Sequence, residues 1–321
     1  MSRTFAASFL LSLGLLGPAD RAGAQTVLPG LNATMRAERE LVPSGHDVRV
    51  LLILEASKDV DLPGDLLTGL VLDTKVDDKP GTRINEPGKG GAVALRAGTR
   101  IERTLTVPIG RLLPAGGSSS DFARITLSWP DLPGANCMVK VAPDCGKLNV
   151  DDLDLAKTKV VLVTGAGDMT LVFLADKAPG TVKNFVKLAM SGFYDGTRFH
   201  RTIRNFMIQG GDPNTKDESK KDSWGQGNPG YTIKGEVNGT KHVRGVLSMA
   251  NSGSPDTAGS QFFICHRDAS HLDAGYTAFG NLEKGADVLD AIATAPVGGP
   301  QGDAPVNPVM LYYALVLPVK K

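Results

Sequence analysis

The sequence predicts a mainly β protein with two domains: an N-terminal immunoglobulin-like β-sandwich and a C-terminal closed or nearly closed β-barrel capped by helices. Three observations lead to this prediction. The 321 residues exceed one average domain, and their composition, 41% hydrophobic and 21% charged, is ordinary for a globular protein. Short strand-like runs separated by glycine- and proline-rich turns fill most of the chain. Only two segments have helical periodicity.

Residues 25–149 are predicted to form the β-sandwich. Three segments, Val48–Leu54, Ile101–Ile109 and Phe122–Trp129, combine alternation with β-branched or apolar runs. Turns rich in Gly, Pro, Asp and Ser separate them, as is typical of immunoglobulin-like sandwiches. This half carries no recognisable catalytic motif, so binding of a partner protein or a spacer function is what remains for it.

Residues 1–24 have the pattern of a secretory signal peptide. Arg3 precedes an apolar stretch over residues 5–16, and a small-residue run ends in AGA at residues 22–24. We therefore expect an exported protein, periplasmic or secreted. The apolar stretch and all later ones are shorter than the roughly 18 residues of a membrane helix, so an integral membrane protein is not expected. A retained N-terminal anchor is the alternative.

Charge and cysteine content argue against nucleic-acid or membrane partners and against a fold held together by disulfides. The formal net charge is +1, from 35 basic and 34 acidic residues, and no global field favours nucleic acid or an anionic membrane. Three cysteines are too few for a disulfide-stapled fold. Cys265 lies in an apolar run and is expected to be a buried thiol. The spacing of Cys137 and Cys145 does not decide between a disulfide and two thiols.

Residues 150–157 are predicted to link the sandwich to a second domain, residues 158–321. Apolar runs at 160–163 and 169–174 flank the turn sequence TGAGD and predict a β-hairpin. A further strand is expected at 309–317. Few helices and many antiparallel strands together predict the barrel.

Two helices are predicted in this second domain. The first is expected to open at Pro179, which suits the first helical position, and to end before Gly192. Its apolar positions recur at i, i+3, i+4 and i+7: Val182, Phe185, Val186 and Ala189. The second helix is expected at Asp287–Ala293.

Residues 199–212 (FHRTIRNFMIQGGD) carry most of the chemistry. Strand alternation is expected to place Phe199, Arg201 and Ile203 on one face and His200 on the other. A cation in an otherwise apolar strand requires hydrogen-bond acceptors from the protein or from a substrate. With the later segments VLSMAN, GSQFFIC and YTAFG, the chain offers a basic residue, two amides and large apolar side chains. It offers no arrangement suited to nucleophilic or metal chemistry, and no cofactor or metal is expected.

These segments resemble the signature stretches of cyclophilins, which run FHR, FMxQGGD, MAN, GSQFFI and FG in this order. They stand here at residues 199–201, 206–212, 249–251, 259–264 and 279–280. The resemblance also includes Lys183-Asn184-Phe185 in the first predicted helix and covers about residues 158–319. It implies an eight-stranded antiparallel barrel closed by two helices. It further implies a peptidyl-prolyl cis/trans isomerase whose partners are proline-containing polypeptides and which assists the folding of exported proteins.

The resemblance implies a role for each matching residue. Arg201 would be the catalytic guanidinium, and Gln209 and the backbone of Asn251 would hold the peptide by hydrogen bonds. The proline pocket would consist of Phe206, Met207, Phe263 and Leu272. The groove would also be lined by His200, Ala250, Ser252 and Gln261.

Two substrate-binding positions depart from the best-known vertebrate pattern. His271 stands where that pattern has Trp, and Tyr276 stands where it has a pocket His. Tyr is a common substitute in bacterial-type members, whereas loss of the Trp leads us to expect weak cyclosporin binding. The alternative function is a non-catalytic module that docks proline peptides in the same groove. Retention of both Arg201 and Gln209 favours the isomerase, because docking alone does not require the arginine.

Overall fold

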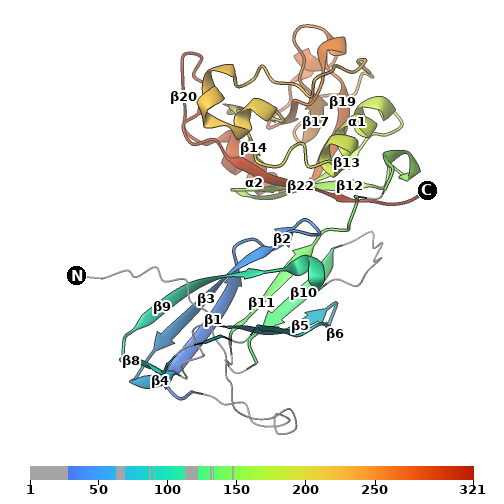
Figure 1. The fold of residues 1–321 in the computed structure, drawn as a ribbon. Helices are drawn as coiled ribbons and strands as arrows, with labels where there is room; N and C mark the ends of the chain where they lie inside the picture. The colour runs from blue at the N-terminus through green and yellow to red at the C-terminus, as the bar shows by residue number, and fades with distance from the viewer. Residues whose placement is uncertain are drawn as a thin grey trace. The chain divides into compact units, whose positions relative to one another are not determined.

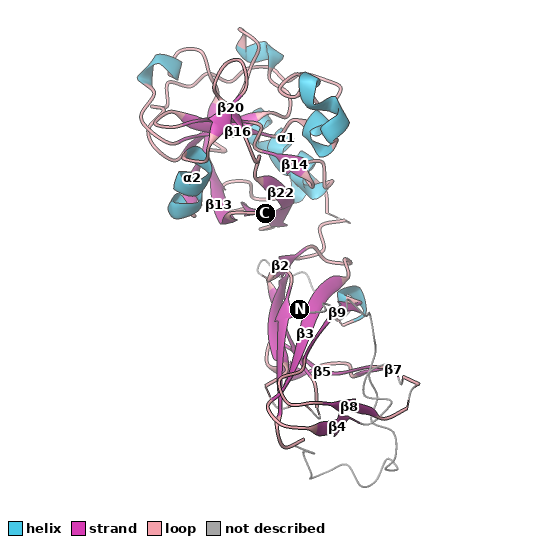
Figure 2. Ribbon diagram, turned by 90° about the vertical axis from the view of Figure 1, so that its left-hand side faces the viewer, coloured by secondary structure: helices cyan, strands magenta, loops and turns pink. Residues whose placement is uncertain are grey.

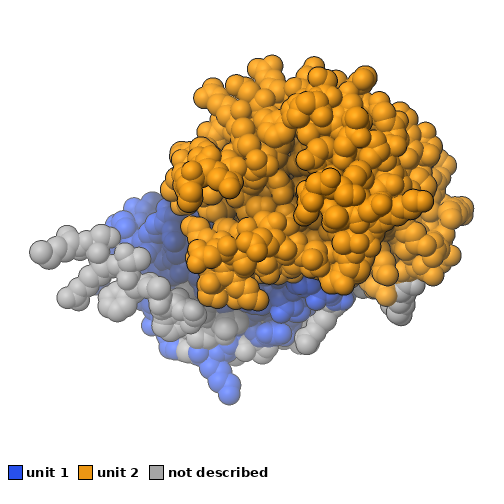
Figure 3. All heavy atoms as spheres, turned by 90° about the horizontal axis from the view of Figure 1, so that it is seen from above, with its two compact units in different colours: residues 1–142 blue, residues 143–321 orange. Residues whose placement is uncertain are grey.

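The protein is described here by a computed structural model. The description covers residues 28–62, 69–86, 88–89, 91–112, 122–130, 132, 134–146 and 148–321. The chain forms two compact units that divide between Ala142 and Pro143, coloured separately in Figure 3. The predicted domain boundary after residue 149 therefore falls inside the second unit. The predicted signal peptide, residues 1–24, lies outside the described residues.

Unit 1, residues 1–142, contains two larger sheets (Figure 1). One has the order β1-β3-β9, with strands Leu31–Ala37, Val48–Ala56 and Arg100–Val107. The other has the order β2-β11-β10-β5-β6, with strands Leu41–Val42, Asn136–Val141, Ala123–Ser128, Leu70–Val76 and Lys79–Pro80; β7 (Ile84–Glu86) also pairs with β5. A separate two-stranded sheet joins β4 (Val60–Leu62) to β8 (Val93–Leu95). Among the described strands of unit 1, every pairing is antiparallel except that of β2 with β11.

The two sheets share one hydrophobic core. Alternate residues of β3 are buried, among them Leu52 and Leu54, and they belong to the same cluster as Ile125 and Leu127 of β10. Period-two burial on one face of each sheet is the signature of a sandwich. The alternating runs in the sequence therefore predicted the layers of unit 1 correctly.

Residues 150–157 are not a linker between domains, contrary to the sequence prediction. Val150 and Leu153 are buried in the core of unit 2. The backbone N–H of Asp154 donates to the carbonyl of Val319 over 2.7 Å, and Leu153 forms an isolated bridge with Lys320. The segment begins with the acidic sequence VDDLDL, residues 150–155. Its three apolar side chains pack on the core of unit 2: Val150 and Leu153 are buried in it, and Leu155 is partly buried against it.

Unit 2, residues 143–321, is built on one curled antiparallel sheet (Figures 1 and 2). Its order is β14-β22-β12-β13-β19-β17-β18-β16-β15. The strands are, in that order, Thr197–Arg198, Met310–Leu317, Lys159–Thr164, Gly167–Phe173, Ala278–Lys284, Val246–Met249, Phe262–Cys265, Met207–Gly210 and Arg201–Ile203. A small hairpin adds β20 (Val297–Gly298) and β21 (Ala304–Pro305).

The segment 197–203 closes this sheet. Its first part, β14, pairs with β22, and its second part, β15, pairs with β16 at the other end of the strand order. Between them, Phe199 N–H donates to Val309 and His200 N–H donates to Gln209. The two end strands are therefore successive pieces of one segment. Counted as one, they make the eight-stranded closed barrel that the family resemblance predicted.

Both predicted helices are confirmed. α1 spans Pro179–Met190, and Gly192 follows it at φ +69°, a left-handed conformation that favours glycine. α2 spans Ala286–Ala293. The two helices lie on different sides of the barrel in both views (Figures 1 and 2). Phe185 of α1 anchors the core, with its ring centroid 5.0–5.4 Å from those of three aromatic residues: Tyr194, Phe262 and Phe279.

All three cysteines are thiols. Cys137 packs partly against the core of unit 1, whereas Cys145 packs against that of unit 2 and Cys265 is buried. Burial raises the pKa of Cys137 and of Cys145 to about 11, so neither is a reactive thiolate. Among the described residues, no helix is both long and apolar enough to cross a membrane.

The position of residues 143–153 yields a prediction about the isolated second unit. A fragment of residues 143–321 should fold alone, whereas one beginning at Asp154 should be markedly less stable because it lacks Val150 and Leu153. In the longer fragment, Leu153→Ala should lower the free energy of unfolding by about 2–5 kcal/mol, as for other buried leucines. Urea titrations of the three proteins measure this, and equal midpoints for the two fragments would contradict it.

Candidate functional site

Strand alternation divides the apolar residues of unit 2 into two sets on opposite faces of the barrel wall. The inward residues of β16, β17 and β18 join the main core, among them Ile208, Leu247 and Ile264. Outward residues form a second cluster, here called the outer cluster: Met207, Val246, Phe263, Cys265, Ala269, Leu272 and Ala278. An apolar cluster on the outside of a closed barrel requires a cover, either from loops or from a ligand.

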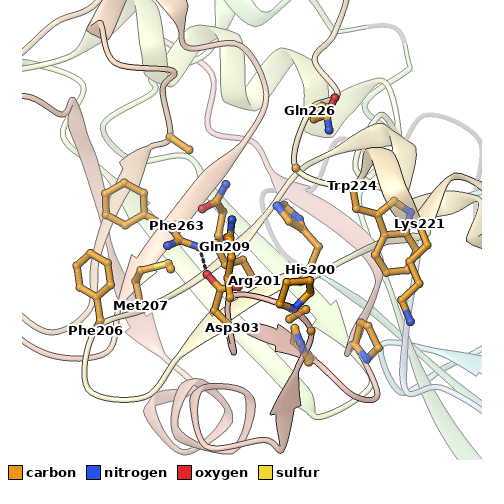
Figure 4. A pocket seen from close by; sticks show the side chains of 18 of the residues that line it. His200, Arg201, Phe206, Met207, Gln209, Lys221, Trp224, Gln226, Phe263 and Asp303 are labelled. Atoms are coloured by element: carbon orange, nitrogen blue, oxygen red, sulfur yellow. Dashed lines mark hydrogen bonds and ion pairs between the residues drawn. The ribbon is translucent and has the colours of Figure 1, made fainter.

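A cleft of about 570 Å³ opens over the outer cluster. Ten of the thirteen predicted site residues line it: His200, Arg201, Phe206, Met207, Gln209, Ala250, Asn251, Phe263, Leu272 and Tyr276. Figure 4 shows the polar Arg201 and Gln209 in the middle, with Phe206, Met207 and Phe263 on one side and Trp224 and Lys221 on the other. The cleft therefore combines an apolar pocket with a hydrogen-bonding floor.

Arg201 lies on β15 with its guanidinium bound at one nitrogen. Nε donates to Oδ2 of Asp303 over 2.7 Å, an ion pair visible in Figure 4. The side chain of Arg201 is 41% exposed. Its two terminal nitrogens make no hydrogen bond with any residue in the described part of the chain. The cation thus has the protein acceptor that its strand position required, and it retains free donors.

The sequence analysis places Phe199 on the same face as Arg201, and the structure shows that this prediction is wrong. Phe199 is buried in the main core, whereas Arg201 lines the cleft, so the two do not share a face. The reason is the break between β14 and β15, where the strand changes partners and simple alternation fails. His200 lines the cleft beside Arg201 and is nearly fully buried, and burial lowers its pKa.

Gln209 is held by a second amide. Its Nε2 donates to Oε1 of Gln261 over 2.9 Å, and Nε2 of Gln261 donates to the carbonyls of Gly225 and Gly227. The sequence predicts that Gln261 lines the groove, but it is not among the residues that line the cleft. It lies behind Gln209 and fixes the orientation of the Gln209 amide. The carbonyl oxygen of Gln209 remains available to a ligand.

Asn251 offers its backbone to the cleft. Its side chain is occupied, since Nδ2 donates to the Gly275 carbonyl over 3.0 Å and Oδ1 accepts from the N–H of Gly253 over 3.1 Å. Its own backbone N–H and carbonyl have no hydrogen-bond partner among the described residues. Unpaired backbone groups at a cleft wall can pair with an extended peptide, as at a sheet edge.

A buried polar network supports the pocket, and no local sequence pattern marks it. Phe263 stacks on His242 with ring centroids 6.0 Å apart and packs edge-on against Tyr276 at 5.6 Å. Nδ1 of His242 lies 3.1 Å from Oδ1 of Asp273, and Nε2 lies 3.0 Å from Oγ of Ser248. Burial lowers the pKa of His242, and hydrogen bonds from the backbone of His242 and from Lys241 lower that of Asp273 to about 2.

Two further predicted residues lie beside the cleft without lining it. The ring of His271 is 5.4 Å from that of Phe206, at the outer edge of the pocket. Ser252 is exposed, and its N–H donates to Oγ1 of Thr257. Both residues are exposed.

The wall opposite the pocket was not anticipated as part of the site. It consists of Lys221, Asp222, Trp224 and Gln226 together with the hairpin region 298–308. Residues 216–222 form short, mostly exposed 3-10 turns. No group of three or more His, Cys, Asp or Glu residues in the described part of the chain is placed to hold a metal ion.

Comparison with known proteins identifies the family. The family model described as "Cyclophilin type peptidyl-prolyl cis-trans isomerase/CLD" matches residues 159–314. A peptidyl-prolyl cis-trans isomerase of Synechococcus elongatus is 48% identical over 126 residues, which is 39% of this chain and 81% of that protein. The chain therefore belongs to the cyclophilin family. We refer to residues 143–321 below as the cyclophilin unit.

Other relatives match the same part of the chain. An Arabidopsis thaliana peptidyl-prolyl cis-trans isomerase is 42% identical over 154 residues, 47% of this chain and 91% of that protein. A Helicobacter pylori peptidyl-prolyl cis-trans isomerase is 44% identical over 148 residues, which is 44% of this chain and 85% of that protein. A crystal structure of a Cryptosporidium parvum cyclophilin-type isomerase, determined in the presence of the dipeptide Ala-Pro, is 32% identical and covers 49% of this chain and 98% of that one, with a TM-score of 0.44.

Burial of two histidines, His200 and His242, predicts a loss of stability at mildly acidic pH. The pKa values of His200 and His242 are lowered from 6.5 in the folded state, so as pH falls below 6.5 the unfolded chain takes up their protons first. The free energy of unfolding of the cyclophilin unit should therefore decrease between about pH 7 and 5. Urea titrations followed by Trp224 fluorescence in a Trp129→Phe background measure this.

His242→Gln should reduce the steepness of this pH dependence because it removes one of the two titrating groups. His46→Gln, at an exposed histidine in unit 1, is the matched control and should leave the dependence unchanged. A stability that stays constant or rises from pH 7 to 5 would contradict a lowered pKa for both histidines.

Proposed function

We propose that the cyclophilin unit isomerises X-Pro peptide bonds of exported polypeptides and that Arg201 is its catalytic residue. One observation carries the proposal: a guanidinium with unoccupied terminal N–H groups lies in the same cleft as an apolar pocket of the outer cluster. Membership of the cyclophilin family supports the same activity.

The chemistry requires few groups. Rotation about an amide bond has a barrier of about 18–20 kcal/mol because of its double-bond character, and no covalent bond has to break. A catalyst must bind the twisted amide better than either planar isomer. When the amide twists, the lone pair of the proline nitrogen is released from conjugation. A donor N–H of Arg201 can then hydrogen-bond to that nitrogen and stabilise the twisted state.

The remaining groups hold the peptide. In our proposal the proline ring enters the pocket of Phe206, Met207, Phe263 and Leu272, which binds it through apolar contact. The backbone of Asn251 pairs with the peptide backbone, and the fixed amide of Gln209 binds a peptide group near the rotating bond. The proline side is thereby anchored while the preceding carbonyl turns.

Export and assistance in protein folding are part of the proposal. The support for export is the pattern of residues 1–24, with one early arginine, a short apolar stretch and a small-residue cleavage pattern. An exported isomerase would act on exported polypeptides in the periplasm or outside the cell. Unit 1 would then serve to bind a partner or to act as a spacer.

Removal of the guanidinium is the direct test of catalysis. Arg201→Ala should lower turnover by roughly 10²–10³-fold with much less effect on peptide affinity, because the lost donor acts on the twisted state. Arg201→Lys should recover only part of the loss, since an ammonium lacks the planar fork. Exchange NMR on a proline peptide reports binding and on-enzyme isomerisation separately.

The matched control is Arg204→Ala, an exposed arginine that does not line the cleft, and it should retain full turnover. If Arg201→Ala binds peptide poorly but isomerises bound peptide at the normal rate, Arg201 is a binding residue. If the wild-type protein binds proline peptides without isomerising them, the docking module replaces the isomerase.

Cyclosporin should bind weakly to this cyclophilin unit. His271 beside Phe206 stands where drug-sensitive relatives carry Trp, so an indole N–H and a large apolar face are both missing. His271→Trp should tighten inhibition at least about tenfold, equivalent to about 1.4 kcal/mol, and leave peptide turnover nearly unchanged. Inhibition of turnover measures this, and nanomolar inhibition of the wild type would contradict it.

A further inference from the structure

The hairpin of β20 and β21 brings a carboxylate into the cleft from a distant part of the chain. Its two strands pair at Val297–Pro305 and Gly298–Ala304, and Gly302 N–H donates to Gly299 in the turn. Asp303 lies next to β21 and follows Arg201 by 102 positions. The hairpin therefore forms one wall of the cleft beside the proposed catalytic strand.

Asp303 is attached to β15 at two points. Its backbone carbonyl accepts from the N–H of Thr202 over 2.8 Å, and its side chain accepts from Nε of Arg201 over 2.7 Å. The backbone bond fixes the position of Asp303 relative to the strand that carries Arg201. The side chain of Asp303 is 17% exposed and that of Arg201 is 41% exposed, so Asp303 is the more buried partner of the pair.

The effect of the ion pair depends on which nitrogen of the Arg201 guanidinium binds the carboxylate. A carboxylate that bound Arg201 through both terminal nitrogens would occupy the planar fork that a substrate needs. Here it binds Nε, at the base of the fork, and the terminal nitrogens have no partner in the described part of the chain. The bond thus restricts the rotamers of a flexible side chain and leaves its outer donors free.

Stability does not account for the arrangement. Ion pairs that are this exposed contribute little to the free energy of folding. Positioning of a reacting group has a much larger effect, because a small displacement of the group can lower the rate by up to about 10²-fold. The pair is therefore better explained by catalysis than by folding.

We propose that Asp303 is a positioning residue that holds the guanidinium of Arg201 in its catalytic orientation through Nε. This inference rests on the proposed catalytic role of Arg201. It assigns a function to a hairpin that matches none of the recognised sequence motifs.

Substitution of the carboxylate tests the inference in the full-length protein. Asp303→Ala should lower kcat about tenfold and change KM less than about twofold, since orientation is lost while the pocket remains. Asp303→Asn keeps an acceptor oxygen and should lose less. Asp287→Ala, at an exposed aspartate in the first turn of α2, is the control for removal of a carboxylate and should retain wild-type kcat.

A double substitution separates positioning from a general structural effect. In an Arg201→Ala background, Asp303→Ala should change the residual rate less than about twofold, because no Nε remains for it to hold. A further tenfold loss in that background would show that Asp303 supports the cleft in another way, and it would overturn the inference.

Exchange NMR of the arginine side chain provides a readout that does not depend on turnover. The Nε–H signal of Arg201, assigned by its loss in Arg201→Lys, should exchange with water at least about tenfold faster in Asp303→Ala than in wild type. Unchanged exchange together with unchanged kcat would refute the inference. Faster exchange in a protein without isomerase activity would confirm the contact and refute the proposed function instead.

Discussion

The barrel of the cyclophilin unit is closed by an exchange of strand partners within residues 197–203. The backbone pairs with β22 before Phe199 and with β16 after His200, so its hydrogen bonds continue while the side-chain alternation is interrupted. As a result Phe199 packs in the core and Arg201 faces the cleft. Closure of the barrel and presentation of the guanidinium follow from the same backbone feature.

The two faces of the barrel wall have different roles: the inward face forms the core, and the outward face forms the cleft. Inward residues of β16, β17 and β18 pack with the helices in a closed core, whereas outward residues build the outer cluster over which the cleft opens. Because a β-strand is rigid and its side chains alternate strictly, the pocket residues are placed by the core on the other side. The buried network of His242, Ser248 and Asp273 satisfies the polar atoms beneath Phe263.

One pattern recurs among the polar groups of the cleft. Each is held through atoms that a peptide does not need: Arg201 through Nε, Gln209 through its amide nitrogen, and Asn251 through its side chain. The terminal guanidinium nitrogens, the Gln209 carbonyl oxygen and the Asn251 backbone remain for a ligand. Groups fixed in advance lose less entropy on binding and need not reorganise when the amide twists.

The local elements and most of the residues that line the cleft were predictable from the amino-acid sequence. Helix α1 and the hairpin of β12 and β13 follow from periodicity and turn residues, whereas the pocket residues follow from the resemblance of short motifs to cyclophilin signature stretches. Three features are evident only in the folded chain: Val150 and Leu153 belong to the second core, Phe199 packs inward, and Asp303 accepts a hydrogen bond from Arg201. The partners in such contacts lie far apart in the sequence. A contact between residues 102 positions apart depends on barrel closure and leaves no periodic signal in the sequence.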